Sequence, residues 1–297
     1  MLVFIIPQVA NPANITNFKE GRNNKNQPLS YRFLLYVIDM NAYERVIKAR
    51  DGKRPSGAYF TNAITTGFIE LHGDRRFADD GAIVSGIGYL DDMPVTVIAM
   101  ERGTSIEERM RRSFGCPSPE GYRKALRLMK QAEKFKRPVI CIINSSGANC
   151  GIGAEERGQG QAIAENLMEM MTLKTPIISV VTGEGGSGGA LALSVADSII
   201  MLENAVYSVI SPEGCASILW KDSAKADEAA EALKLTADDL LKFGVADKVI
   251  RESGKDYDEI CRDLKVEIVN ELKRFKAMSE SSLLDKRYKK YREIGKL

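Results

Sequence analysis

Histidine is almost absent from this chain: one residue of 297, His72, carries an imidazole. A hydrolase of the Ser-His-Asp kind needs a histidine base, and in the α/β-hydrolase order this base follows the nucleophilic serine. The chain does contain the Gly-x-Ser-x-Gly pattern of that class at Gly185, Ser187 and Gly189, but His72 lies far upstream of it. The sequence therefore argues against a serine hydrolase, and we expect His72 to have a surface or structural role.

Cysteine is sparse and irregularly spaced. No two of the five cysteines are in Cys-x-x-Cys spacing; they are Cys116, Cys141, Cys150, Cys215 and Cys261. An odd number without such a pair is typical neither of a disulfide framework nor of a structural zinc site, so we predict that this chain binds no metal ion. Reduced thiols are the ordinary state of cysteine in the cytoplasm, and we expect a cytoplasmic protein.

Long apolar runs and an excess of one charge are missing as well. The apolar run at residues 2–6 ends at Pro7 and is too short to span a membrane or to form the core of a signal peptide. The 42 basic and 40 acidic side chains leave a formal net charge of +2, so we expect neither a membrane nor nucleic acid as a partner. With 44% hydrophobic residues, the chain is able to bury a full globular core.

One glycine-rich stretch stands out, at residues 176–197 (PIISVVTGEGGSGGALALSVAD). Its residues 177–181 predict a buried strand, and residues 190–196 predict a buried helix. Between them lie Gly183, Gly185, Gly186, Gly188 and Gly189. Glycine lets a substrate approach the backbone closely, and the first N–H groups of a helix have no partner within it. The stretch therefore predicts a place where backbone amides hold developing negative charge.

Two other interpretations of this stretch fit less well. A phosphate-binding loop needs a lysine and then a serine or threonine after the glycines, whereas Ala190 and Leu191 stand there. A glycine turn could also simply pack a helix on a sheet, with no ligand. An oxyanion hole fits best because it is built from backbone amides and requires no particular side chain.

Segments typical of strands and helices alternate along most of the chain. Strands are predicted at residues 83–90 and 95–100, which form a hairpin, and at 139–143, 198–202 and 207–210. Helices are predicted at residues 31–50, 118–137, 154–171, 224–243 and 256–278. This alternation indicates an α/β fold with parallel strands. The loops at 144–153 and 182–189 then open at one edge of the sheet, where ligands of such folds bind.

Four runs of sequence resemble one protein family. They read PEGYRKALRLM at residues 119–129, GAEERGQ at 153–159, GEGGSGGALA at 183–192 and YSVISPEGCASILWK at 207–221. Together they look like the α subunit of the carboxyltransferase of bacterial multi-subunit acetyl-CoA carboxylase. The similarity covers roughly residues 60–250.

The resemblance implies a fold and an activity. The implied fold is α/β, the crotonase (ClpP-like) spiral of ββα units. We expect an irregular N-terminal extension at residues 1–30, a crotonase-like carboxyltransferase domain at 31–255 and a C-terminal helical tail at 256–297. The implied activity is transfer of the carboxyl group of carboxybiotin to acetyl-CoA, which gives malonyl-CoA for fatty acid biosynthesis. Biotin is then a co-substrate, and no cofactor is expected to be bound by this chain.

The resemblance also implies partners. The family forms an α2β2 assembly whose active site lies between an α and a β subunit, and the β subunit usually carries a four-cysteine zinc ribbon. The expected partners are therefore a zinc-ribbon β subunit, the biotin carboxyl carrier protein and acetyl-CoA. Two alternatives stay open: a carboxyltransferase subunit for another acyl-CoA or pathway, and a non-catalytic assembly subunit.

Site residues follow from the same resemblance. In the family, the two glycines after the turn serine hold the biotin carbonyl, and these positions match Gly188 and Gly189, which we predict to be catalytic. Biotin itself is able to take the methyl proton of acetyl-CoA, so no side-chain base is needed. Substrate-binding residues are predicted in the turn and in two neighbouring loops, at Gly185, Gly186, Ser187, Gly147, Gly151, Gly153, Ser211, Pro212, Glu213 and Gly214.

One loop departs from what is usual in the family, and the last residues have a basic composition. Most family members have Asp-Thr-Pro-Gly-Ala-Tyr-Pro-Gly where residues 144–151 read Asn-Ser-Ser-Gly-Ala-Asn-Cys-Gly, so we expect a loop with less proline-imposed stiffness. Residues 285–297 are rich in lysine, arginine and tyrosine, and we expect them to form a solvated face or a subunit contact.

Overall fold

The structure is a computed structural model that describes residues 40–296. The extension expected at residues 1–30 and the first part of the helix expected at 31–50 lie outside the described residues. The rest of that helix is present as α2 (Ala42–Arg50). It begins at a capping box, in which the side chain of Asn41 accepts from the Glu44 amide and the side chain of Glu44 accepts from the Asn41 amide.

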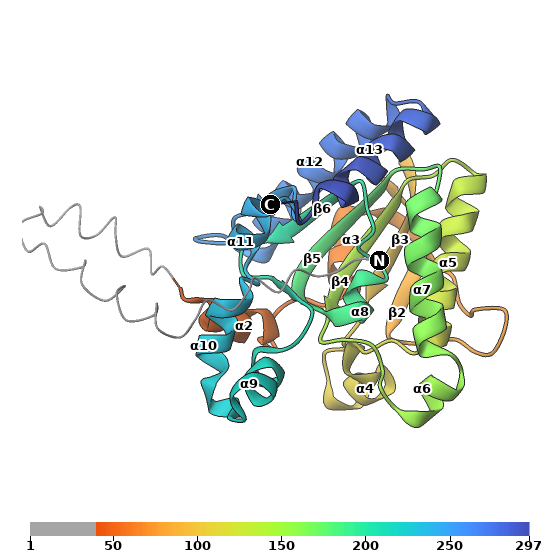
Figure 1. The fold of residues 1–297 in the computed structure, drawn as a ribbon. Coiled ribbons are helices and arrows are strands. Elements are labelled where there is room, and N and C mark those ends of the chain that lie inside the picture. Colours follow the sequence, from red (N-terminus) through yellow and green to blue (C-terminus); the bar gives the residue numbers. More distant parts are fainter. Residues whose placement is uncertain (1–39, 297) are drawn as a thin grey trace, which may run out of the picture.

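An eight-stranded sheet forms the centre of the described residues (Figure 1). Its strands follow the order β1 (Thr66–Glu70), β2 (Ile83–Leu90), β3 (Met93–Met100), β4 (Val139–Ser145), β5 (Ile177–Gly186), β6 (Ser198–Leu202) and β8 (Lys248–Ile250). The short strand β7 (Val206–Ser208) pairs with β5 outside this path. The first three strands are antiparallel, and those from β3 to β8 are parallel. The predicted hairpin and parallel strands are confirmed.

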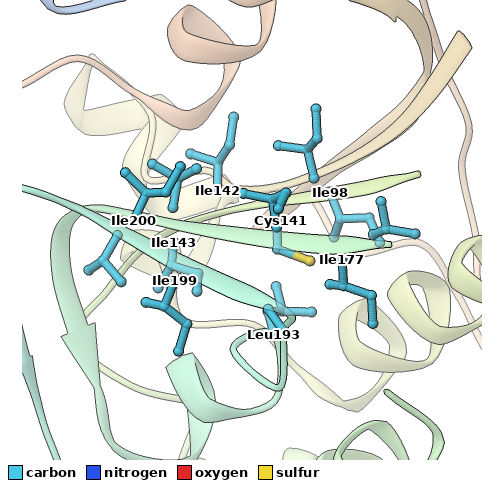
Figure 2. Packing of buried hydrophobic residues seen from close by; sticks show 14 of the residues in the cluster. Ile98, Cys141, Ile142, Ile143, Ile177, Leu193, Ile199 and Ile200 are labelled. Carbon is cyan, nitrogen blue, oxygen red and sulfur yellow. The ribbon is translucent and has the colours of Figure 1, made fainter. Parts of the chain in front are cut away.

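The middle of the sheet is the core of the protein. Every residue of β4 is buried, and so are the first seven of β5. Such continuous apolar runs are typical of parallel strands that are covered on both faces. Figure 2 shows how side chains of neighbouring strands pack there, with labels on Ile98, Cys141, Ile142, Ile143, Ile177, Leu193, Ile199 and Ile200.

Helices cover the sheet. The helix α5 (Pro119–Lys134) lies beside α7 (Gln159–Thr172), as Figure 1 shows. Helix α3 (Gly57–Ile64) contacts α12 (Tyr257–Lys276). The helix predicted from Ser118 is confirmed, with proline in its first turn. The apolar face predicted for α12 is also confirmed, because its residues are buried: Ile260, Leu264, Ile268, Leu272 and Phe275.

Two predicted helices are each divided in the structure. The helix expected at 154–171 consists of α6 (Ile152–Glu156) and α7, separated by Gly158, whose φ of 81° no helix allows. The helix expected at 224–243 consists of α10 (Ala226–Leu233) and α11 (Ala237–Lys242), which are separated by a left-handed residue, Lys234. The break at Lys234 was concealed because apolar residues continue at helical spacing on both sides of it.

The helix predicted at residues 190–196 was wrong. Strand β5 continues through the first glycines to Gly186, because residues 184–186 pair with β7. A short helix, α8 (Ser187–Leu191), then begins three residues earlier than expected and gives way to turns. The strands β1 and β8 were not predicted; β1 is mostly exposed and β8 has only three residues, so neither shows a clear apolar pattern.

The basic C-terminal segment was predicted as a solvated face or a subunit contact, and part of it is neither. Residues 280–293 form α13 (Glu280–Glu293), in which Arg287 is fully buried. Its guanidinium donates two hydrogen bonds to the carboxylate of Asp197 and three to backbone carbonyls. On the same helix, Lys290 pairs with Asp247 and Tyr291 bonds the backbone around residues 194–196.

Candidate active site

The glycine turn lies where β5 passes into α8. Ser187 there has a φ of 54°, a left-handed conformation that costs a non-glycine residue energy. The first amides of α8, those of Ser187, Gly188 and Gly189, have no partner within the helix. The residue that precedes them, Gly186, has no side chain to cap them. The turn therefore presents backbone donors in a fixed, strained geometry.

Steric contacts explain two of the glycines. A Cβ at Gly186 would overlap the carbonyl oxygen of Ser146, and a Cβ at Gly189 would lie 2.5 Å from the amide nitrogen of Ala148. Both neighbours belong to the loop after β4, so the turn and this loop are packed backbone against backbone. Gly188 differs, since a Cβ there would meet only the side chain of Ile163, at 3.8 Å.

The loop at residues 144–151 is tied at both ends by side-chain hydrogen bonds. Asn144 Oδ1 accepts from the amide of Glu184, which ties the start of the loop to the end of β5. Gln159 Nε2 donates to the carbonyl oxygens of Pro117 and Asn149 at 2.8 Å each, which ties its far end. The loop and the glycine turn thus form one unit at the carboxyl edge of the parallel strands, as predicted.

A cavity of about 260 Å³ lies beside the turn. Its walls come from the turn, from the segment after β7, from α2 and from the loop after β4. The lining residues are Val46, Arg50, Ser146, Glu184, Gly185, Gly186, Ser187, Val206, Ser208, Val209, Ile210, Ser211, Pro212 and Leu235. Of the predicted substrate-binding residues, this set includes Gly185, Gly186, Ser187, Ser211 and Pro212.

The other predicted site residues do not line this cavity, and the predicted catalytic residues Gly188 and Gly189 are among them. Gly147 is packed against the turn, where a Cβ on Gly189 would meet its carbonyl carbon at 2.7 Å. Gly151 and Gly153 lie farther along the loop, at the start of α6. Glu213 and Gly214 lie in the first turn of α9 (Pro212–Trp220), where the Gly214 amide donates to the N-cap residue, Ser211.

Sequence reasoning missed the residue that joins the walls of the cavity, Arg50. Its Nε donates to Glu184 Oε1 at 2.7 Å, and its Nη1 donates to Glu213 Oε1 at 2.7 Å. The hydroxyl of Tyr43 donates to the same Glu213 oxygen at 3.2 Å. The Arg50 guanidinium beside Glu213 holds the pKa of that carboxyl below its usual value. The glutamates are more than 130 residues away in the chain, so no local pattern could have indicated this contact.

Tyr122 of α5 is a second residue that the sequence did not indicate. Its side chain is fully buried, and its hydroxyl has no hydrogen-bond partner among the described residues. The hydroxyl lies at the junction of turn and loop, 2.9 Å from where a Cβ on Gly189 would be. Burial raises the pKa of Tyr122 well above its ordinary value, so the phenol stays protonated.

Neither a metal centre nor a membrane segment is found within residues 40–296. No group of three or more histidine, cysteine, aspartate or glutamate side chains is arranged there to hold a metal ion. None of the helices in this part of the chain combines the length and the apolar character that a bilayer span requires. His72 is mostly exposed, pairs with Asp79 at 2.9 Å and does not line the cavity beside the glycine turn.

The fold and the turn define a class of protein. The structure superposes on transcarboxylase 12S, solved with methylmalonyl-coenzyme A and methylmalonic acid bound, with a TM-score of 0.63. The two sequences are 19% identical, and the match covers 79% of this chain and 44% of the other, so this chain spans less than half of that protein. The fold is that of the crotonase-like carboxyltransferases, as expected.

Sequence comparison then identifies the family. A family model described as acetyl co-enzyme A carboxylase carboxyltransferase-like matches residues 23–295. The acetyl-coenzyme A carboxylase carboxyl transferase subunit alpha of Ruminiclostridium cellulolyticum is 59% identical over 256 residues, which cover 86% of this chain and 98% of that one. The same subunit of Clostridium botulinum is 54% identical over 273 residues, or 91% of this chain and 100% of that one. The chain belongs to the family of acetyl-CoA carboxylase carboxyltransferase α subunits, a component of biotin-dependent carboxyltransferases.

Proposed function

We propose that the glycine turn holds the ureido oxygen of carboxybiotin on the backbone amides of Gly188 and Gly189, and that the cavity beside the turn accommodates the biotin ring. One observation carries this proposal: uncapped backbone donors in a strained turn lie next to a cavity of about 260 Å³. Donors fixed in this way stabilise negative charge where it develops, and they need no reorganisation during the reaction.

The lining of the cavity supports this ligand. Val206, Val209 and Leu235 form an apolar part, which suits the sulfur ring and the aliphatic arm of biotin. The hydroxyls of Ser146 and Ser208 and the backbone of the turn form a polar part, which suits the ureido group. An amphipathic ring would thus be oriented with its polar edge toward the turn.

The proposed chemistry is electrostatic. As the carboxyl group leaves carboxybiotin, the electrons of the broken C–N bond pass into the ureido group, and the amides of the turn stabilise the charge on its oxygen. The methyl proton of acetyl-CoA is taken up by biotin, and the enolate that forms attacks the released CO2 to give malonyl-CoA. The ionisable side chains among the described residues that line the cavity are Arg50 and Glu184, which pair with each other, and this agrees with a reaction in which the protein supplies no side-chain base.

The proposal assigns three partners. A zinc-ribbon β subunit would provide the pocket for the acetyl-CoA thioester in an α2β2 assembly, and a biotin carboxyl carrier protein would deliver carboxybiotin. Membership in the α-subunit family supports this arrangement and favours acetyl-CoA over another acyl-CoA.

All five cysteines are free thiols, which supports a cytoplasmic location. The division into segments at residues 30 and 255 stays a prediction.

The function is tested by the reverse half-reaction, decarboxylation of malonyl-CoA with free biotin as acceptor. The chain is assayed alone and with the β subunit from the same genome. Activity only with the partner is the expected result. A complex that forms but turns over no malonyl-CoA would point to another acyl-CoA or to an assembly role.

A cavity-filling substitution tests the site itself. Val209 lines the cavity and is 38% exposed, so Val209→Trp should fill the cavity without disturbing the core. We expect biotin-dependent decarboxylation to fall about 100-fold, since the ring could no longer reach the turn. Val266→Trp is the matched control, because Val266 is exposed on α12 and does not line the cavity. Equal activity of the two variants would remove the cavity from the proposal.

A further inference from the structure

Helix α2 forms one wall of the cavity beside the glycine turn. Val46 and Arg50, one turn apart on α2, both line the cavity. Val46 is 1% exposed and packs in an apolar cluster with Val206 and Leu235, which line the cavity as well. The wall is therefore fixed in place by apolar contacts, and Arg50 extends from a rigid base.

Arg50 joins this wall to two of the other walls. Its Nε bonds Glu184, which directly precedes Gly185 and Gly186 of the turn. Its Nη1 and Nη2 bond both oxygens of Glu213, at 2.7 and 3.3 Å, in the first turn of α9. A planar guanidinium that makes bidentate bonds fixes distance and angle together, which a point charge does not. Among the described residues lining the cavity, Arg50 is the one basic side chain.

We propose that Arg50 is a positioning residue, which sets the width of the cavity and the orientation of the glycine turn by holding the carboxylates of Glu184 and Glu213 on one guanidinium. Both carboxylates lie within 2.7 Å of it. Without the cation they would face each other as like charges and move apart. Because Glu184 continues into the turn and Glu213 into α9, the turn and the α9 wall would separate with them.

The surroundings of the cluster determine its response to pH. On α2, Tyr43 donates to Glu213. From α10, Asp227 adds negative charge near Tyr43, and Glu231 accepts from the amide of Ala42. The charges that face Arg50 are thus mostly acidic, so a variant without the cation should bind a proton within the cluster at a higher pH than the native chain does.

The first experiment compares Arg50→Met with Arg45→Met in the full chain assembled with its β subunit. Arg45 is on the same helix but bonds the Glu203 carbonyl and Asn204, away from the cavity. Malonyl-CoA decarboxylation is measured with biocytin as acceptor. For Arg50→Met we expect the KM for biocytin to rise and kcat/KM to fall about 10- to 100-fold, as for a lost positioning contact. Arg45→Met should keep the native KM, and Arg50→Lys should lie between the two.

Two further readouts separate positioning from mere structural support. The deficit of Arg50→Met should shrink as the pH falls toward about 5, because a proton shared by the carboxylates removes their repulsion. The double variant Arg50→Met, Glu213→Gln should recover part of the lost kcat/KM at neutral pH for the same reason. If Arg50→Met fails to fold, this double variant is compared with Glu213→Gln alone.

Hydrogen exchange provides a test that does not need activity. Amides of residues 184–189 should exchange faster in Arg50→Met than in the native chain or in Arg45→Met. The kinetic experiment rests on the proposed function. A native complex that neither binds biocytin nor decarboxylates malonyl-CoA would overturn that function, and hydrogen exchange alone would then decide whether Arg50 positions the turn. An active native enzyme, with native KM and native exchange in Arg50→Met, would overturn the role of Arg50 alone.

Discussion

An arginine lies near each end of strand β5, and the two differ in burial and in how many of their hydrogen bonds are made. At its start, Arg287 is 0% exposed, and all five of its N–H groups are bonded, two of them to Asp197. At its far end, the side chain of Arg50 is 32% exposed and makes three hydrogen bonds to two glutamates. At the start of the strand the arginine is buried and all of its N–H groups have partners. At the far end the arginine is partly exposed and belongs to an ion-pair cluster beside a cavity.

The difference extends to the neighbouring residues. Near the start, the Asp197 carboxylate also accepts from the Ile177 amide, so its charge is fully compensated. Near the end, Ser187 is strained and the buried hydroxyl of Tyr122 has no hydrogen-bond partner among the described residues. Polar groups that are satisfied stabilise a fold, whereas strain and unused hydrogen-bonding capacity are kept where a site must interact with something else. The comparison predicts that the start of β5 controls stability and the end controls activity.

The largest effect is expected from Arg287→Met. It would leave the Asp197 carboxylate buried without a countercharge, which costs about 3–5 kcal/mol in the free energy of unfolding. Urea unfolding followed by circular dichroism measures this loss. Arg292→Met on the same helix is the control, because Arg292 is exposed and should change stability by less than about 0.5 kcal/mol. A loss below about 1 kcal/mol for Arg287→Met would contradict the comparison.

The second effect is expected at the other end of β5, where the same substitution at two adjacent glycines should change stability by different amounts. Gly189→Ala places a methyl group 2.5 Å from the Ala148 amide nitrogen, and we expect about 1–3 kcal/mol of destabilisation together with loss of carboxyl transfer. Gly188→Ala meets only Ile163 at ordinary contact distance and should leave the fold intact. Thermal unfolding and the decarboxylation assay measure both. Similar losses of stability in the two variants would show that the contact with the 144–151 loop does not determine the conformation of the turn.

Elements that depend on neighbours in the chain could be predicted from the sequence. Strands β4, β5 and β6 are continuous apolar runs, and α12 repeats its apolar residues at helical spacing, so their existence follows from the residues alone. The glycine turn was placed correctly because glycines interrupt such a run. The end of β5 was not, since it is set by pairing with β7 more than 20 residues later.

The two arginines could not be predicted, for one physical reason. Arg287 was assigned to a solvated basic tail because arginine is rarely buried, and only the distant Asp197 makes its burial possible. For Arg50 the sequence predicts only the last residue of a helix, and its partners are 134 and 163 residues away. The turn of the candidate site is encoded locally, but the walls of its cavity are brought together by tertiary contacts.

The third effect is a pH dependence of the free energy of unfolding, and it arises from a residue in the middle of the sheet. Burial raises the pKa of Cys141 to about 12. The unfolded thiol ionises near its ordinary pKa of about 8.5, so between these values unfolding releases a proton and stability falls as the pH rises, by up to about 1.4 kcal/mol per pH unit. Cys141→Ala should show a weaker dependence in urea unfolding at about pH 8 and about pH 10, whereas exposed Cys150→Ala should behave like the native chain. Equal slopes in all three would mean that ionisation of Cys141 is not linked to unfolding.

The smallest effect on stability is expected when a tyrosine near each end of β5 is replaced by phenylalanine. The hydroxyl of Tyr291, near the start of β5, donates to the Ser194 carbonyl and accepts from the Ala196 amide, at 2.7 Å each. Tyr291→Phe should therefore lose about 1 kcal/mol, because the Ala196 amide is left buried without a partner. Tyr122→Phe removes a hydroxyl that has no hydrogen-bond partner among the described residues, so it should leave stability unchanged or raise it by up to about 1 kcal/mol. Differential scanning calorimetry resolves the two. A loss of stability at Tyr122 as large as that at Tyr291 would show that the Tyr122 hydroxyl is satisfied in solution, and the contrast between the two ends of β5 would then rest on the arginines alone.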